Sequence, residues 1–149
     1  MEKNGLVTSY TMSKVFIDTN VLVYLFDKNE DVKKSQSVRL LQKFKTDTKE
    51  RAVISTQILQ EFYVSCVKKL KIDPLIVKRY ITQLENFEIV QITPALINSA
   101  IDKSILNQLS FWDSLVIAAA ETAKCKILLT EDLNHGQKIQ GIKIENPFT

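Results

Sequence analysis

The sequence contains little glycine and proline, three residues of each among 149. Collagen-like repeats and long flexible linkers require far more of both, so these classes are excluded. No segment is long and apolar enough to span a bilayer, and the first residues lack the apolar stretch of a secretory signal. We therefore expect a protein built of regular helices and strands, with no membrane partner.

Cysteine and net charge are also sparse. The two cysteines, Cys66 and Cys125, are far apart in the sequence and do not form a metal-binding pair. Cys66 lies on an apolar helical stripe, which favours packing over redox chemistry, and we expect a reducing, cytoplasmic compartment. The net charge of +3 permits an anionic partner such as RNA but does not require one.

The length suits one domain. We expect residues 1–12 to be a disordered N-terminal extension and residues 13–149 to form a single domain. Apolar runs predict strands at Lys14–Asp18, Arg51–Ser55, Phe87–Ile92 and Lys126–Thr130, with a weaker strand at Ile142–Glu145.

Helical patterns separate most of these runs. Apolar residues recur at helical spacing over residues 58–70, and prolines suited to a first turn begin helices at Pro74 and Pro94. Asp113–Lys124 is apolar almost all round and is predicted to be buried. Strands alternating with helices predict an α/β fold with a parallel sheet, covered by helices on both faces in three layers.

Four acids carry the candidate chemistry. Asp18 and Asp132 follow predicted strands, Asp113 begins the buried helix, and Glu61 lies in the helix after the second strand. In parallel sheets, ligands bind beyond the carboxyl ends of the strands. Gathered carboxylates repel one another unless a divalent cation lies among them. Mg²⁺ and Mn²⁺ prefer oxygen ligands and assist phosphodiester hydrolysis, so this acid set favours that chemistry over zinc chemistry.

Each acid also has a purely structural interpretation. Asp18 is a preferred helix cap, Asp113 completes a capping-box spacing with Ser110, and Asp132 suits a turn. Glu61 lies off the apolar stripe, which predicts a solvated side chain. The combination favours a site, because three of the acids fall at one predicted edge of the sheet.

Four segments resemble the PIN-domain family. They are DTN at 18–20, ISTQILQEFY at 54–63, SFWDSLVIAAA at 110–120 and LLTEDLNHG at 128–136. Their order and approximate spacing agree with the family from Val15 to Gly136, and the last two segments are the more specific. The resemblance is to the ribonuclease toxins of bacterial type II toxin–antitoxin systems, of the virulence-associated protein C type.

This resemblance implies a metal-dependent endoribonuclease that leaves a 5′-phosphate and a 3′-hydroxyl. It further implies a homodimer that is silenced by a small antitoxin protein. Asp18, Glu61, Asp113 and Asp132 would bind Mg²⁺ or Mn²⁺ directly or through water. Asn20 and Thr130 would orient carboxylates or waters.

Alternative functions and residue roles remain open at this point. A PIN nuclease of RNA processing or degradation fits the same motifs. A receiver-like signalling domain would show adjacent acids after the first strand, and a haloacid-dehalogenase phosphatase needs an aspartate where Asn20 stands. Glu131 is expected to face solvent and His135 to occupy a turn. Phe111 and Trp112 could stack on a base, but core packing is favoured.

Overall fold

In the computed structural model, which describes residues 13–149, the strands form a six-stranded sheet of order β3-β2-β1-β4-β6-β5. β1, at the centre, pairs in parallel with β2 on one side and with β4 on the other. Val15, Phe16 and Ile17 of β1 are almost fully buried, because both faces of this strand are covered. The strands are β1 (Ser13–Ile17), β2 (Glu50–Ser55), β3 (Glu88–Val90), β4 (Ile127–Leu129), β5 (Lys138–Ile139) and β6 (Ile142–Glu145).

The five predicted strands are confirmed, but the sheet is not parallel throughout. β5, which the sequence did not predict, pairs antiparallel with β6 at the edge of the sheet. The turn between them uses Gln140 and Gly141, both with positive φ, at 52° and 80°. Two residues are too few to show an apolar pattern, so a strand of this length leaves no periodic signal.

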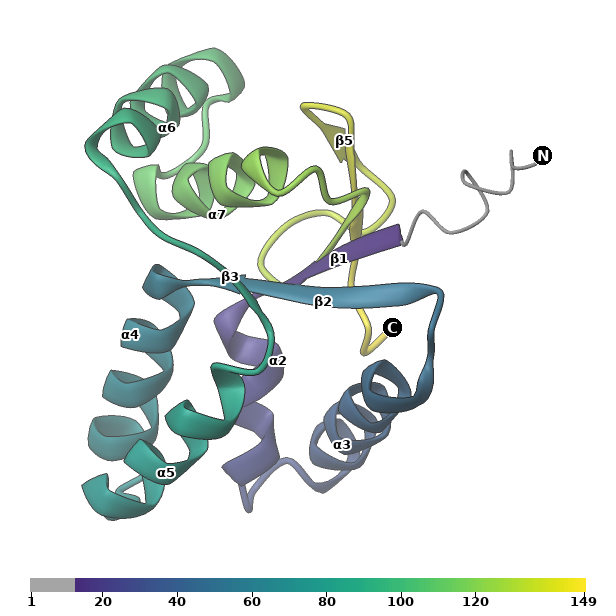
Figure 1. The fold of residues 1–149 in the computed structure, drawn as a ribbon, viewed down its shortest axis with the longest axis vertical. Helices are drawn as coiled ribbons and strands as arrows, with labels where there is room; N and C mark the ends of the chain where they lie inside the picture. Colours follow the sequence, from purple (N-terminus) through teal and green to yellow (C-terminus); the bar gives the residue numbers. More distant parts are fainter. Residues whose placement is uncertain (1–12) are drawn as a thin grey trace, which may run out of the picture.

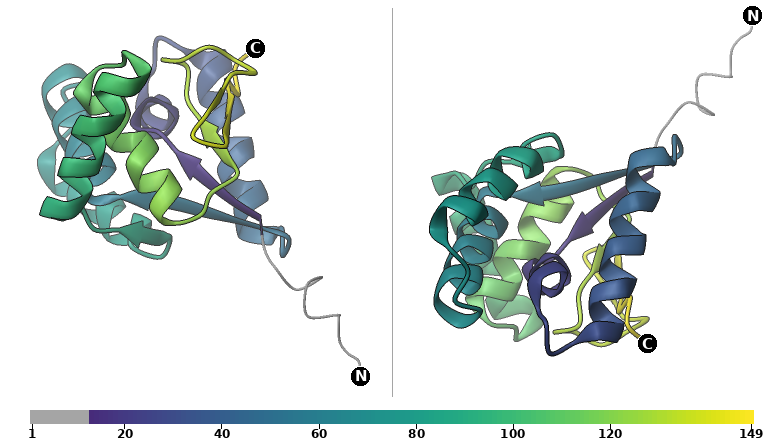
Figure 2. Two further views of the ribbon diagram at one scale, coloured as in Figure 1. Left: turned by 90° about the horizontal axis from the view of Figure 1, so that it is seen from above. Right: turned by 90° about the horizontal axis from the view of Figure 1, so that it is seen from below.

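Helices cover both faces of the sheet, which confirms the three-layer architecture (Figures 1 and 2). The helices α6 and α7 lie on one face, and the other helices lie on the opposite face. Among residues 13–149, no helix is long and apolar enough to cross a membrane. The helices are α2 (Thr19–Val23), α3 (Asp31–Thr46), α4 (Thr56–Val64), α5 (Pro74–Leu84), α6 (Pro94–Asn107) and α7 (Phe111–Thr122).

Two helix boundaries differ from the prediction. α7 begins at Phe111, two residues before Asp113, because the Ser110 hydroxyl caps it by accepting a 3.0 Å hydrogen bond from the Asp113 amide. The helix predicted over residues 58–70 changes after α4 into a π-helical turn, η2 (Ser65–Lys69). The buried character of α7 is as predicted, since residues 114–120 are all buried.

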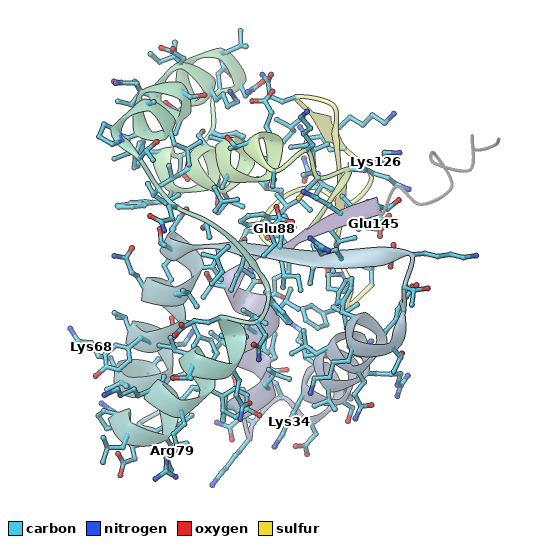
Figure 3. The ribbon with its side chains drawn as sticks, viewed as in Figure 1. Lys34, Lys68, Arg79, Glu88, Lys126 and Glu145 are labelled. Atoms are coloured by element: carbon cyan, nitrogen blue, oxygen red, sulfur yellow. The ribbon has the colours of Figure 1, made fainter. Side chains whose placement is uncertain are left out.

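Some basic side chains lie on the outside of the layer formed by α2–α5. Figure 3 shows Lys68 and Arg79 pointing away from the body of the protein, and both are exposed. Such positions are usual for lysine and arginine, which are mostly exposed in folded proteins. The hydrophobic core lies on the inner side of the helices, between the sheet and its two helical layers.

Candidate functional site

Asp18 lies directly after β1 and is only 6% exposed. Its Oδ1 accepts a 2.8 Å hydrogen bond from the Thr19 amide, and the residue is the N-cap of α2. Its Oδ2 accepts a 2.8 Å hydrogen bond from the Thr130 hydroxyl. The capping interpretation is therefore correct. It does not exclude a role in a site, because each carboxylate oxygen retains a further lone pair.

Thr130 occupies the equivalent place after β4. The register pairs Ile17 with Leu129, so the residues that follow them emerge side by side at the carboxyl edge of the sheet. Thr130 is completely buried, and its hydroxyl oxygen also accepts a 3.1 Å hydrogen bond from the Asp132 amide. One threonine thus holds Asp18 and the backbone of Asp132 in a fixed relation.

Glu61 is not the solvated side chain that the helical periodicity predicted. It is half-buried, and its carboxylate accepts hydrogen bonds from the Thr19 hydroxyl at 2.7 Å and from Gln57 Nε2 at 3.3 Å. Sequence reasoning missed both donors. Gln57 stands one helical turn before Glu61, a spacing that places two side chains on the same face and could have identified it.

A single cavity of about 810 Å³ joins these groups. Asp18, Asn20, Glu61 and Asp132 all line it, so four of the six predicted site residues converge. Thr130 lies buried behind Asp18. Asp113 is not among the lining residues, although it is close enough for its charge to raise the pKa of Asp132.

The electrostatics are those of crowded carboxyl groups. Burial raises the pKa of Asp18 to about 6, and the charges of Asp132 and Glu61 add to this effect while the hydrogen bonds oppose it. Burial also raises the pKa of Asp132, followed by the charges of Asp113 and Glu131. Asp18 and Asp132 are therefore harder to ionise, first because of burial and then because of neighbouring negative charges, and a cation would relieve this situation.

The oxygen donors of the cavity are of the kind that a hard divalent ion prefers. Asn20 Oδ1 is buried and has no hydrogen-bond partner among residues 13–149, which adds a carbonyl oxygen to the carboxylates. Over residues 13–149, however, no three histidine, cysteine, aspartate or glutamate side chains converge closely enough to form one closed metal cluster. These groups therefore fit an ion that contacts one or two carboxylates and reaches the others through water, as Mg²⁺ commonly does.

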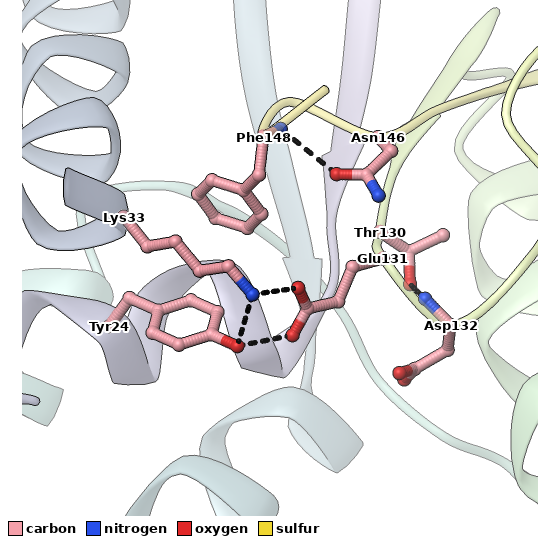
Figure 4. Close-up of polar contacts among 7 residues, drawn as sticks. All are labelled: Tyr24, Lys33, Thr130, Glu131, Asp132, Asn146 and Phe148. Atoms are coloured by element: carbon pink, nitrogen blue, oxygen red, sulfur yellow. Dashed lines mark hydrogen bonds and ion pairs between the residues drawn. The ribbon is translucent and has the colours of Figure 1, made fainter. Parts of the chain in front are cut away.

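Glu131 is partly exposed, as a solvent-facing position predicts, but its carboxylate is held by other side chains (Figure 4). Its side chain is 22% exposed; it accepts a hydrogen bond from the Tyr24 hydroxyl and forms a 3.0 Å ion pair with Lys33. The Lys33 ammonium also lies 4.9 Å from the centre of the Tyr24 ring and 5.6 Å from that of Phe148. Glu131 thus lines the same cavity but is held there by partners of its own.

The remaining sequence expectations have mixed outcomes. His135 lies in a turn, as predicted, and its Nδ1 accepts a 3.0 Å hydrogen bond from the Asn146 amide. Phe111 is half-buried and packs against the core, as predicted. Core packing is wrong for Trp112, whose side chain is 62% exposed and lines the cavity. The predictions for residues 1–12 lie outside the described part of the chain.

Comparison with known proteins gives a consistent result. The family model described as PIN domain matches residues 15–138. No curated protein sequence matches the chain. A toxin–antitoxin complex from Klebsiella pneumoniae is 20% identical with a TM-score of 0.66, covering 89% of this chain and 97% of that one.

Two other solved structures extend the comparison. A sarcin-ricin-loop-cleaving toxin from Mycobacterium tuberculosis is 13% identical with a TM-score of 0.61, covering 79% of this chain and 91% of that chain. DNA-bound VapBC from Salmonella typhimurium is 18% identical with a TM-score of 0.62, covering 91% and 99%. At these identities the likeness concerns the fold.

Proposed function

Because the chain belongs to the PIN domain family, we propose that it is a metal-dependent endoribonuclease and the toxin of a type II toxin–antitoxin pair. One observation carries the nuclease proposal. Asp18, Glu61 and Asp132, from three distant parts of the chain, line one cavity at the carboxyl edge of the sheet. Asn20 lines it too, and its Oδ1 has no hydrogen-bond partner within the described part of the chain. Such a group of oxygen donors supports binding of Mg²⁺ or Mn²⁺.

The proposed roles follow from the contacts of each residue. A divalent ion in this cavity would polarise the scissile phosphate and lower the pKa of a water molecule. Asp18 and Asp132 would hold the ion, and Thr130 fixes their relative position through its hydrogen bonds. Thr19 and Gln57 fix the carboxylate of Glu61. Asp113, next to the cavity, would act on the ion through water.

Two functions within the family remain to be separated. A toxin is favoured because structures of similar fold include toxin–antitoxin complexes and an RNA-cleaving toxin. An RNA-processing or degradation nuclease would use the same site. We also propose a small antitoxin protein and a second copy of the chain as partners, and a cytoplasmic location, where RNA is present and the two free cysteines stay reduced.

Cleavage of RNA by the purified protein tests the nuclease proposal. We expect cleavage with Mn²⁺, none with a chelator, and none by Asp18→Asn or Asp113→Asn. Asp102→Asn is the matched control, since it removes the same charge from an exposed position on α6 and should cleave normally. Wild-type cleavage by Asp113→Asn in Mn²⁺ would show that the site is assigned wrongly.

Expression in cells separates the toxin from a processing enzyme. A toxin should arrest growth when it is expressed alone, and an adjacent gene should encode a small protein that binds it and restores growth. Harmless expression would favour processing or degradation. Sequencing the RNA ends would test for the 5′-phosphate and 3′-hydroxyl, and sizing chromatography would test the homodimer.

A further inference from the structure

Trp112 is the only tryptophan of the chain, and its side chain is 62% exposed. Large aromatic side chains are usually well buried, so this exposure calls for an explanation. The residue lies in the first turn of α7, directly before Asp113. It is also one of the residues that line the cavity containing the carboxylates.

The backbone and ring of Trp112 are held in place despite the exposure. Its carbonyl oxygen accepts a 3.3 Å hydrogen bond from Gln57 Nε2, the same amide nitrogen that donates to Glu61. Its ring makes an edge-to-face contact with Phe111, with ring centres 5.1 Å apart, and Phe111 packs against the core. The indole is therefore presented from a rigid element, which favours a binding role over a loosely placed surface side chain.

The cavity combines the features that a nucleotide requires. Trp112 offers an aromatic face, and Val23, Val64 and Leu70 add apolar surface. Lys69, which lines the same cavity, offers a positive charge for a phosphate. Aromatic side chains bind single-stranded nucleic acids by stacking on bases, and this contact tolerates any base.

We propose that Trp112 is the stacking platform for a nucleobase next to the scissile phosphate. This inference rests on the proposed function, and it specifies the substrate as RNA with an unpaired base at the cleavage point. A base in a continuous duplex is stacked between its neighbours and does not offer a face to the indole. Trp112 is thus a substrate-binding residue adjacent to the metal-binding acids.

Intrinsic fluorescence gives a direct test, because all tryptophan emission comes from Trp112. The full-length wild-type protein is titrated with short RNAs in a chelator, which prevents cleavage, and binding is followed separately by anisotropy of a labelled RNA. Single-stranded RNA should quench the emission. A strand of equal length with abasic positions, and a duplex of the same sequence, should not. Single-stranded RNA that binds without quenching would overturn the inference.

Substitution gives the second test. Trp112→Ala should raise the KM for single-stranded RNA about 5- to 150-fold, the range expected for loss of one stacked base, with a much smaller change in kcat. Trp112→Phe should recover most of the affinity because it retains an aromatic face. Ile105→Ala is the control, since it shortens an apolar side chain that is 74% exposed on α6 and should leave KM unchanged.

The outcomes separate this inference from the proposed function. If the wild type cleaves RNA and Trp112→Ala does so with the same KM, the nuclease proposal is supported and the stacking role is wrong. If Trp112→Ala lost the ability to bind the antitoxin but kept the wild-type KM for RNA, the indole would belong to a protein interface and the inference would again be wrong. Quenching by RNA without any cleavage would support base stacking while contradicting the nuclease.

Discussion

The Thr130 hydroxyl donates a 2.8 Å hydrogen bond to Asp18 Oδ2, joining two residues 112 positions apart in the sequence. The same hydroxyl oxygen accepts the amide hydrogen of Asp132 at 3.1 Å. Thr130 is completely buried, so water does not replace either contact when the hydroxyl is removed. The side chain therefore couples the geometry of two proposed metal ligands.

Thr130→Val keeps the shape of the side chain but removes both hydrogen bonds. We expect the free energy of unfolding to fall by about 1–3 kcal/mol, because a buried carboxylate and a backbone amide lose their partners. Urea unfolding measures this change, and RNA cleavage should fall as well. Thr130→Ser, which retains the hydroxyl, should keep most of the cleavage activity. Full activity in Thr130→Val together with loss of activity in Thr130→Ser would show that the methyl group matters rather than the hydrogen bonds.

Glu131 and Asp132 are adjacent acids, and we expect their substitution to have different effects on RNA cleavage. Glu131 is bound by Tyr24 and Lys33, so its carboxylate is already occupied. Glu131→Gln should retain cleavage and lower the free energy of unfolding by no more than about 1 kcal/mol, since the ion pair is partly exposed. Asp132→Asn, an equal change in charge one residue later, should abolish cleavage. If both variants were equally inactive, Glu131 would have to be included in the site.

β1, β2 and β4 were predictable because each continuous apolar run is a local signal. The acids at their carboxyl ends were predictable for the same reason, since a parallel sheet brings strand ends such as those before Asp18 and Thr130 to one edge. The π-helical turn at Ser65–Lys69 was not, because apolar spacing does not distinguish a π turn from the end of an α-helix.

Contacts between distant side chains were beyond sequence reasoning. The hydrogen bond from Thr19 to Glu61 spans 42 positions, and that from Tyr24 to Glu131 spans 107. Both depend on how α2, which contains Thr19, and the turn after it, which begins at Tyr24, pack against their neighbours, and nothing in the local pattern specifies this. The burial of Trp112 was predicted wrongly for a related reason. Its neighbours in the sequence are apolar, which suggests a core position, but its place on α7 directs it towards the cavity.

Binding of Mn²⁺ should stabilise the folded protein. An ion present at about 100 times its dissociation constant adds about 2.7 kcal/mol when it binds only the folded state. Thermal unfolding with and without Mn²⁺ measures the effect, which Asp18→Asn should remove and Asp102→Asn should retain. A Mn²⁺-dependent shift of the same size in Asp18→Asn would mean that the ion binds elsewhere.

Without metal, Asp18→Asn should be more stable than the wild type at neutral pH. Burial raises the pKa of Asp18 from 3.8 to about 6 in the folded state, so the ionised carboxylate destabilises the fold. Below pH 3.8 the Asp18 carboxyl is protonated and does not destabilise the folded protein. As the pH rises through about 6 the carboxyl ionises in the folded state, and the full destabilisation is reached. The wild type therefore carries a cost above pH 6, of at most about 3 kcal/mol, and the uncharged variant does not.

The difference between the two proteins should consequently depend on pH. Urea unfolding in a chelator should show Asp18→Asn to be the more stable at about pH 7.5. The advantage should shrink as the pH falls through about 6 and disappear below pH 3.8, where the aspartate is protonated in both states. Comparing the two proteins at each pH cancels the titration of the groups that do not interact with Asp18. A constant difference across this range, or a less stable variant at neutral pH, would mean that the folded state does not penalise the Asp18 charge. The reason for placing a cation beside it would then be lost.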